Sequence, residues 1–113
     1  MAKRALCFLG FFLFSAIFLF AQIDKGKVYI LCNASDGGSV GLAENYAELR
    51  NIPKSNIVSV QMPLSEEISW EQFDKIYPQI VGGLEKAGAL RSQTVGGKAV
   101  LISHDIDFLV SCL

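Results

Sequence analysis

The sequence predicts an α/β fold, in which three short parallel strands form a βαβαβ unit flanked by helices, behind an N-terminal hydrophobic helix. Three apolar runs, at 28–32, 57–60 and 99–102, have the length and composition of strands that are buried on both faces. The stretches between them contain helical patterns. Strands that alternate with helices form right-handed crossovers, and these crossovers place the strands parallel in one sheet.

The N-terminal segment predicts export. Lys3 and Arg4 precede 17 uncharged residues, Ala5–Ala21, which include six phenylalanines. A basic start followed by an apolar run is typical of a secretory signal. The run falls short of the roughly 20 residues of a comfortable membrane span. We therefore predict a signal peptide over 1–21 and a secreted or periplasmic protein. An uncleaved anchor over 5–21 is the alternative, and membrane contact is expected through this segment only.

Composition limits the function further. The chain has 113 residues, with 10 Lys and Arg against 11 Asp and Glu. Without Lys3 and Arg4, eight basic side chains face 11 acidic ones, a formal charge of −3. No basic patch is present, so binding to nucleic acid is not expected. Residues 22–113 are long enough for a single small domain. One histidine and scattered acids give no metal-ligand spacing, and we expect no metal and no cofactor.

The first half of this domain contains clear element boundaries. The strand at 28–32 ends in a polar loop, where Ser39 is a candidate N-cap for a helix over 40–50. Pro53 ends that helix. The second strand, 57–60, is followed by Pro63. The order of the strands stays open, and a 2-1-3 order would place the first strand in the middle.

The second half begins with a capping box and ends unusually. Ser69 and Gln72 have the spacing of a capping box, and Pro78 lies inside the apolar stripe of the helix that comes next. After the third run, 105–112 alternates like an edge strand or a hairpin arm. We therefore expect a domain that is incomplete at its C-terminus, a member truncated from a longer family. A protein partner that completes the sheet edge and a small complete domain are the alternatives.

Candidate site residues are indicated by the parallel sheet, because such sheets bind ligands beyond the carboxyl ends of their strands. We expect the ends of the strands to converge on one edge, and the candidate ligand-binding residues are Asn33, Ser35, Asp36, Gly37, Gly38, Ser39, Ser103 and Asp105. The glycine-bearing loop opens a helix and could bind an anion, or it is simply a turn and N-cap. His104 is the one histidine of the chain and the candidate catalytic base, or it is a plain loop histidine.

The cysteines give no further site. Cys32 and Cys112 remain after removal of the leader, with no Cys-x-x-Cys spacing. A disulfide between them is compatible with export. Two unpaired buried thiols are the expectation we favour.

A string of residues resembles a known group of proteins. It consists of Ala43-x-x-Tyr46-Ala47-x-x-Arg50-x-Ile52-Pro53-x-x-Asn56, followed by Val60-x-Met62-Pro63 and by Glu67-Ile68-Ser69-x-x-x-Phe73. It is similar to the opening of an uncharacterised family of exported bacterial proteins, which are several hundred residues long. In that family the third strand runs into Gly-x-Pro, whereas this chain has Ser103-His104-Asp105-Ile106-Asp107.

A second, weaker resemblance is to the caspase-like and gingipain-like cysteine peptidases. In those enzymes the catalytic histidine follows the third strand, often after serine, and Val100-Leu101-Ile102-Ser103-His104 looks like that strand end. Their cysteine lies after a further strand, and Cys112 is too close to His104 in the sequence to match it. The sequence therefore favours an exported, non-catalytic α/β domain of unknown activity. A peptidase-related domain with His104 in the catalytic position and an extracytoplasmic partner-binding module are the alternatives.

Overall fold

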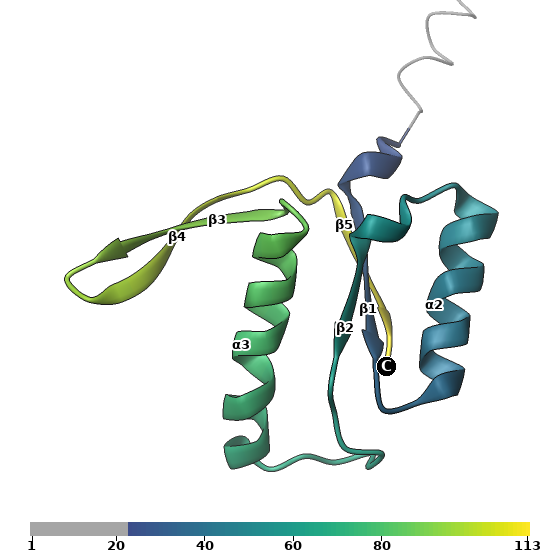
Figure 1. Ribbon diagram of the computed structural model, residues 1–113, viewed down its shortest axis with the longest axis horizontal. Helices are drawn as coiled ribbons and strands as arrows, with labels where there is room; N and C mark the ends of the chain where they lie inside the picture. Colours follow the sequence, from purple (N-terminus) through teal and green to yellow (C-terminus); the bar gives the residue numbers. More distant parts are fainter. Residues whose placement is uncertain (1–22) are drawn as a thin grey trace, which may run out of the picture.

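The structure, a computed structural model, describes residues 23–113 (Figure 1). The predicted signal peptide or anchor, and with it the predicted N-terminal hydrophobic helix, lies outside the described residues. Within 23–113, no helix has both the length and the apolar character needed to cross a membrane.

The predicted α/β class is confirmed, with a three-stranded parallel sheet and two α-helices. A 3-10 turn, η1 (Lys25–Lys27), leads into the first strand, and a second 3-10 turn, η2 (Lys54–Asn56), leads into the second strand. The other elements are β1 (Val28–Asn33), α2 (Gly37–Arg50), β2 (Ile57–Val60), α3 (Trp70–Lys86), β3 (Leu90–Val95), β4 (Lys98–His104) and β5 (Phe108–Cys112).

The sheet has the order β2-β1-β5, so the first strand lies in the middle. All six residues of β1 are buried. Helices α2 and α3 lie on opposite sides of the sheet (Figure 1). Side chains alternate along a strand. Accordingly, Val28, Ile30 and Cys32 pack on the α2 side, and Tyr29 and Leu31 pack on the α3 side.

Helix α2 begins earlier than expected, and the prediction of Ser39 as its N-cap is wrong. Asp36 is the N-cap, and its Oδ1 accepts a hydrogen bond from Gly38 N at 2.9 Å. Ser39 lies within the first turn and is buried. The helix ends at Arg50, and its C-cap is Asn51, a left-handed residue with φ of 55°. Asparagine tolerates this conformation better than most residues.

Helix α3 begins as predicted, because the capping box is present. Ser69 Oγ accepts from Gln72 N at 3.2 Å, and Gln72 Oε1 accepts from Ser69 N at 2.9 Å. Pro78 lies inside the helix. Near its C-terminal end, Gly83 faces β2 so closely that a Cβ atom there would overlap the side chain of Val58. The glycine therefore sets how near α3 lies to the sheet.

The prediction that 99–102 forms the third parallel strand is wrong. That run belongs to β4, which pairs antiparallel with β3, and β5 is the third strand of the sheet. The physical reason is the Gly96-Gly97 turn. Both glycines have positive φ, 59° and 78°, as a two-residue hairpin turn requires. The chain therefore folds back immediately, and the β3–β4 hairpin projects from the body (Figure 1).

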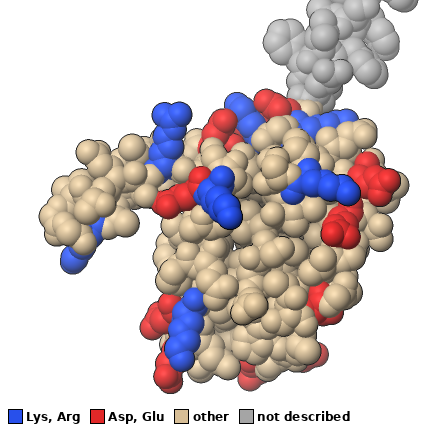
Figure 2. Space-filling model, in the orientation of Figure 1, with Lys and Arg blue, Asp and Glu red and all other residues tan. Residues whose placement is uncertain are grey.

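The hairpin also differs from the body in charge. Between 90 and 104 the charged side chains are Arg91 and Lys98, and no acid is present. Figure 2 shows cationic groups on the projecting arm, whereas the acidic side chains gather on the body. All seven residues of β4 are exposed.

Candidate functional site

The carboxyl ends of β1 and β2 are joined by the side chain of Asn33. Its Oδ1 accepts hydrogen bonds from Ser35 N at 3.0 Å and from Met62 N at 3.1 Å. Asn33 is buried. The amide oxygen of this predicted ligand-binding residue therefore links the loop after β1 to the end of β2.

Ser39 ties the third strand to the same edge. Its Oγ accepts from Asn33 N at 2.8 Å and donates to the carbonyl oxygen of Cys112. The hydroxyl thus bridges β1 and β5 where their own ladder ends. Within 23–113, no buried side-chain nitrogen or oxygen lacks a hydrogen-bond partner. The hydrogen bonds of Asn33 and Ser39 therefore connect all three strands of the sheet at this edge.

The loop proposed for anion binding carries its own negative charge. Ser35, Asp36, Gly37 and Gly38 are exposed. The Asp36 carboxylate caps the first turn of α2, where it interacts favourably with the positive end of the helix dipole. An incoming anion would have to compete with this carboxylate for the same N–H groups.

Ser103, His104 and Asp105 do not join this edge, and the expectation that the strand ends converge is wrong for them. His104 pairs with Leu90, and Asp105 N donates to Ala89 O at 2.8 Å, just beyond the C-terminal end of α3. That place lies near the amino ends of the sheet strands (Figure 1). The cause is again the hairpin, which returns β4 to the end of α3 rather than into the sheet.

The surroundings of His104 form a shallow polar hollow. It is lined by Gly88, Ala89, Arg91, Ser103, His104 and Asp105, with a volume of 260 Å³. Asp105 Oδ1 lies 3.3 Å from Lys27 Nζ, on the surface. The hydrogen bond to Asp105, and then its negative charge, raise the pKa of Lys27. No cysteine lines this hollow.

The two cysteines of residues 23–113 lie together at the opposite end. Cys32 and Cys112 are register partners on adjacent strands, and both are buried free thiols. Burial raises the pKa of the Cys112 thiol, and the neighbouring Cys32 adds to the rise. Cys32 Sγ lies 3.4 Å from Ser59 Oγ. Of the two expectations for this pair, the unpaired thiols are the arrangement that the structure contains.

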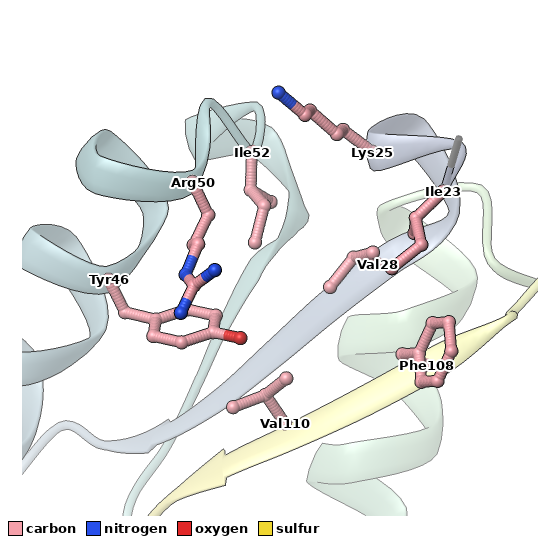
Figure 3. Close-up of a pocket in the computed structure, with 8 residues that line it drawn as sticks. All are labelled: Ile23, Lys25, Val28, Tyr46, Arg50, Ile52, Phe108 and Val110. Atoms are coloured by element: carbon pink, nitrogen blue, oxygen red, sulfur yellow. The ribbon is translucent and has the colours of Figure 1, made fainter. Parts of the chain in front are cut away.

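A groove that the sequence analysis missed runs beside β5 on the α2 side. It has a volume of 330 Å³, near the lower end of the roughly 300–1,000 Å³ of ligand pockets. Its wall and floor come from η1, β1, α2, β5 and the residues just before η1 and just after α2 (Figure 3). Its lining consists of Ile23, Lys25, Val28, Tyr46, Arg50, Ile52, Phe108 and Val110.

Two cations, Lys25 and Arg50, line this groove, and Arg50 stacks on an aromatic ring. The Arg50 guanidinium carbon lies 5.8 Å from the centroid of the Tyr46 ring, one helical turn away on α2 (Figure 3). Stacking of this kind is favourable and orients the guanidinium. Lys27 and Asp105 form the one ion pair within 23–113. Arg50 therefore has no carboxylate partner in the described part of the chain.

The edge of the sheet next to this groove has free main-chain groups. Ala34 N donates to Val60 O at 2.9 Å. The main-chain N–H and C=O groups of successive strand residues point to opposite sides of the strand. Those of Ala34 therefore point toward β2, and those of Leu31 point toward β5. In a parallel pair, the main chain of Leu31 forms its hydrogen bonds with the residues on either side of its register partner, Ser111. This pattern directs the N–H and C=O groups of Leu109 and Ser111 away from the sheet.

Part of this site had a signal in the sequence. Ile106, Phe108, Val110 and Cys112 alternate with other residues, which indicated an edge strand or a hairpin arm. Tyr46 and Arg50 have the i, i+4 spacing of neighbours on a helix. The missing information was the identity of the strand that lies beside β1. Without it, these two patterns could not be assigned to one groove.

Comparison with known proteins adds no relative. The chain matched no model of a protein family, no curated protein and no solved structure. The string that carries the first resemblance contains several buried residues, among them Ala43, Ala47, Ile52 and Asn56. Asn56 Nδ2 donates to Gly26 O and Val28 O, each at 3.0 Å. These four residues therefore have packing roles.

Proposed function

We propose that this chain is an exported, non-catalytic α/β domain that binds a protein partner at the open edge of its sheet, beside β5. The supporting observation is the exposure of this strand on both faces. Phe108, on the α2 side, is 53% exposed, and Leu109, on the other side, is 48% exposed. Parallel sheets are ordinarily covered on both faces, and free strand edges accept further strands.

The other edge of the sheet provides a useful contrast. In β2, Val58 and Val60 are buried, and Gln61 N donates to Gln79 Oε1 of α3 at 3.1 Å. Helix α3 thus covers β2, whereas the corresponding face of β5 has no such cover in the described residues. The asymmetry supports β5 as the edge that a partner would extend.

The export part of the proposal rests on the sequence of residues 1–21. The proposed relationship to the uncharacterised exported family rests on the string between Ala43 and Phe73. The buried positions of that string suit a relationship through the fold, because they pack the helix and the sheet together.

The peptidase-related alternative depends on His104, and the geometry gives it less support. A cysteine nucleophile must lie within hydrogen-bond reach of its imidazole base. His104 is beside the end of α3, whereas Cys32 and Cys112 lie at the carboxyl ends of β1 and β5. We expect the purified chain to turn over no peptide or ester substrate. Turnover that His104→Ala abolishes would overturn the non-catalytic part of the proposal.

The binding part is tested by site-specific crosslinking in the producing cells. A photo-reactive amino acid at Leu109 should form a covalent adduct with a partner protein, because this side chain is at the free edge. The same group at Leu64, which is also exposed but lies in a loop, is the matched control. The adduct should disappear in a Ser111→Pro background, since proline removes one outward N–H. Equal adducts at both positions, or none at Leu109, would contradict the proposal.

A further inference from the structure

We infer that the groove beside β5 selects a partner strand that carries a carboxylate next to apolar side chains. This inference rests on the proposed function, because it concerns the same edge. A strand added to β5 would turn alternate side chains toward the α2 side. Those side chains would lie beside Phe108 and Val110, at the mouth of the groove, where they can enter it.

The apolar part of the selection is set by the lining. Ile23, Val28, Ile52 and Val110 contribute aliphatic surface, and Phe108 contributes an exposed ring at the edge (Figure 3). The volume of 330 Å³ is small. A groove of this size suits one or two aliphatic side chains of an extended segment. Recognition by strand addition uses just such pockets for alternate side chains, while main-chain hydrogen bonds supply affinity.

The preference for a carboxylate is set by the charges. The charged residues that line the groove are Lys25 and Arg50, both cations. Arg50 is held against Tyr46 and has no ion-pair partner within 23–113. Asp24 and Asp107 are nearby in sequence, but neither lines the groove, and Asp24 Oδ1 accepts from Gly26 N. A guanidinium can bind a carboxylate through two parallel hydrogen bonds.

A second copy of this chain fits the groove less well. The strand that would pair edge to edge is β5 itself, Phe108–Cys112, and it contains no acidic residue. Such a pairing would supply no acidic side chain from β5 to Arg50. Charge complementarity thus points to a different protein segment, extended and acidic.

The test uses three short synthetic peptides and the purified chain, produced with its own N-terminal segment. In each peptide, valine alternates with threonine, and one central position is glutamate, glutamine or lysine. Fluorescence anisotropy should give the tightest binding for the glutamate peptide. We expect it to bind roughly tenfold tighter than the lysine peptide, as one charge-assisted hydrogen bond would produce.

Charge reversal in the groove should invert this preference. Arg50→Glu should bind the lysine peptide more tightly than the glutamate peptide. Lys86→Glu is the matched control, because Lys86 is likewise an exposed cation in the last turn of a helix, on α3. It should keep the wild-type order. An unchanged order in Arg50→Glu, or the same inversion in Lys86→Glu, would overturn the inference.

Two edge variants separate failure of the inference from failure of the proposed function. Ser111→Pro and Leu109→Pro should weaken all three peptides alike, because each proline removes an outward N–H from the main-chain edge. If they do so while Arg50→Glu changes nothing, the edge binds strands but the groove does not select them. If peptides bind equally to both edge variants, the proposed edge is wrong as well. A dimer in sedimentation that Ser111→Pro dissociates would assign the edge to a second copy and overturn the inference.

Discussion

Strands β1 and β4 contain similar apolar runs but lie in opposite environments. Val28-Tyr29-Ile30-Leu31-Cys32 is buried throughout, whereas every residue of Lys98–His104 is exposed. The difference is therefore not in the hydrophobicity of the strands. It arises from the segments that flank each strand in the chain.

The connections decide which strand enters the sheet. A parallel neighbour requires a crossover of a dozen or more residues, and α2 supplies one between β1 and β2. Strand β4 comes after β3 with two glycines between them, so it can pair only antiparallel with β3. A hairpin without a third strand or a covering helix is marginally stable. We therefore expect the sheet and the hairpin to differ in how strongly each resists unfolding.

The largest expected difference comes from two matched isoleucines. Ile30→Ala should lower the free energy of unfolding by about 2–5 kcal/mol, because Ile30 is fully buried at the centre of the sheet. Ile102→Ala removes the same atoms from a side chain that is 58% exposed, and should change it by no more than about 0.5 kcal/mol. Urea denaturation measures both. Equal losses would show that the hairpin belongs to the same cooperative unit as the sheet.

The sequence was sufficient for the elements whose local signals agree with their packing. The strand at 57–60 has the predicted bounds, and the capping box fixed the start of α3. In these places the turn residues, the caps and the apolar pattern all favour the same structure. The 2-1-3 order was one of the arrangements left open, and it is the observed one, with β5 as its third strand.

The other predictions failed where one local sequence pattern was compatible with two structures. An apolar run of four residues fits a buried strand and an exposed hairpin equally well, and the partner strand β3 is too polar to have been noticed. Ser39 has the chemistry of an N-cap, but Asp36 has it too and lies at the true start of the helix. The assignment of 99–102 to the parallel sheet also made part of the predicted site wrong, because it placed Ser103, His104 and Asp105 at the carboxyl end of a sheet strand.

Two adjacent glycines of α3, Gly82 and Gly83, test how closely this helix packs on the sheet. Gly83→Ala should destabilise the protein by about 1–3 kcal/mol, because the new methyl group overlaps Val58 of β2 and pushes α3 from the sheet. Gly82→Ala adds a methyl group that meets open space, and should instead stabilise α3 by about 0.5–1 kcal/mol. Opposite shifts of the thermal midpoint are expected. A neutral Gly83→Ala would mean that α3 is not pressed against β2.

A turn variant makes the corresponding test on the hairpin. Gly97→Val places a β-branched residue at φ of 78°, a conformation that costs an L-residue about 1–2 kcal/mol. Amide hydrogen exchange should therefore accelerate over 90–104, while the urea midpoint of the whole protein stays unchanged. Thr94→Val, at an extended position of β3, is the control and should leave exchange slow. A lower urea midpoint of the whole protein with Gly97→Val would show that the hairpin and the sheet unfold as one cooperative unit.

The smallest expected effect is a pH dependence that distinguishes the interior of the sheet from its surface. Burial raises the pKa of Cys112 above its ordinary value of 9.0, so the folded protein holds this proton more tightly than the unfolded chain does. Below pH 9.0 both states are protonated and the stabilisation is complete. Above that value the unfolded chain loses its proton first, and stability should fall as pH rises toward the pKa of the folded state.

Lys27, whose pKa is also raised, would shift stability in the same direction, but its ion pair with Asp105 is on the surface and salt screens it. The alkaline loss should therefore persist at high salt in the reduced protein and shrink in Cys112→Ala, while Asp105→Asn should alter only the part that salt removes. An alkaline loss that high salt abolishes entirely would assign it to the surface pair. The end of β5 would then be less well enclosed between β1 and Ser39 than the structure indicates.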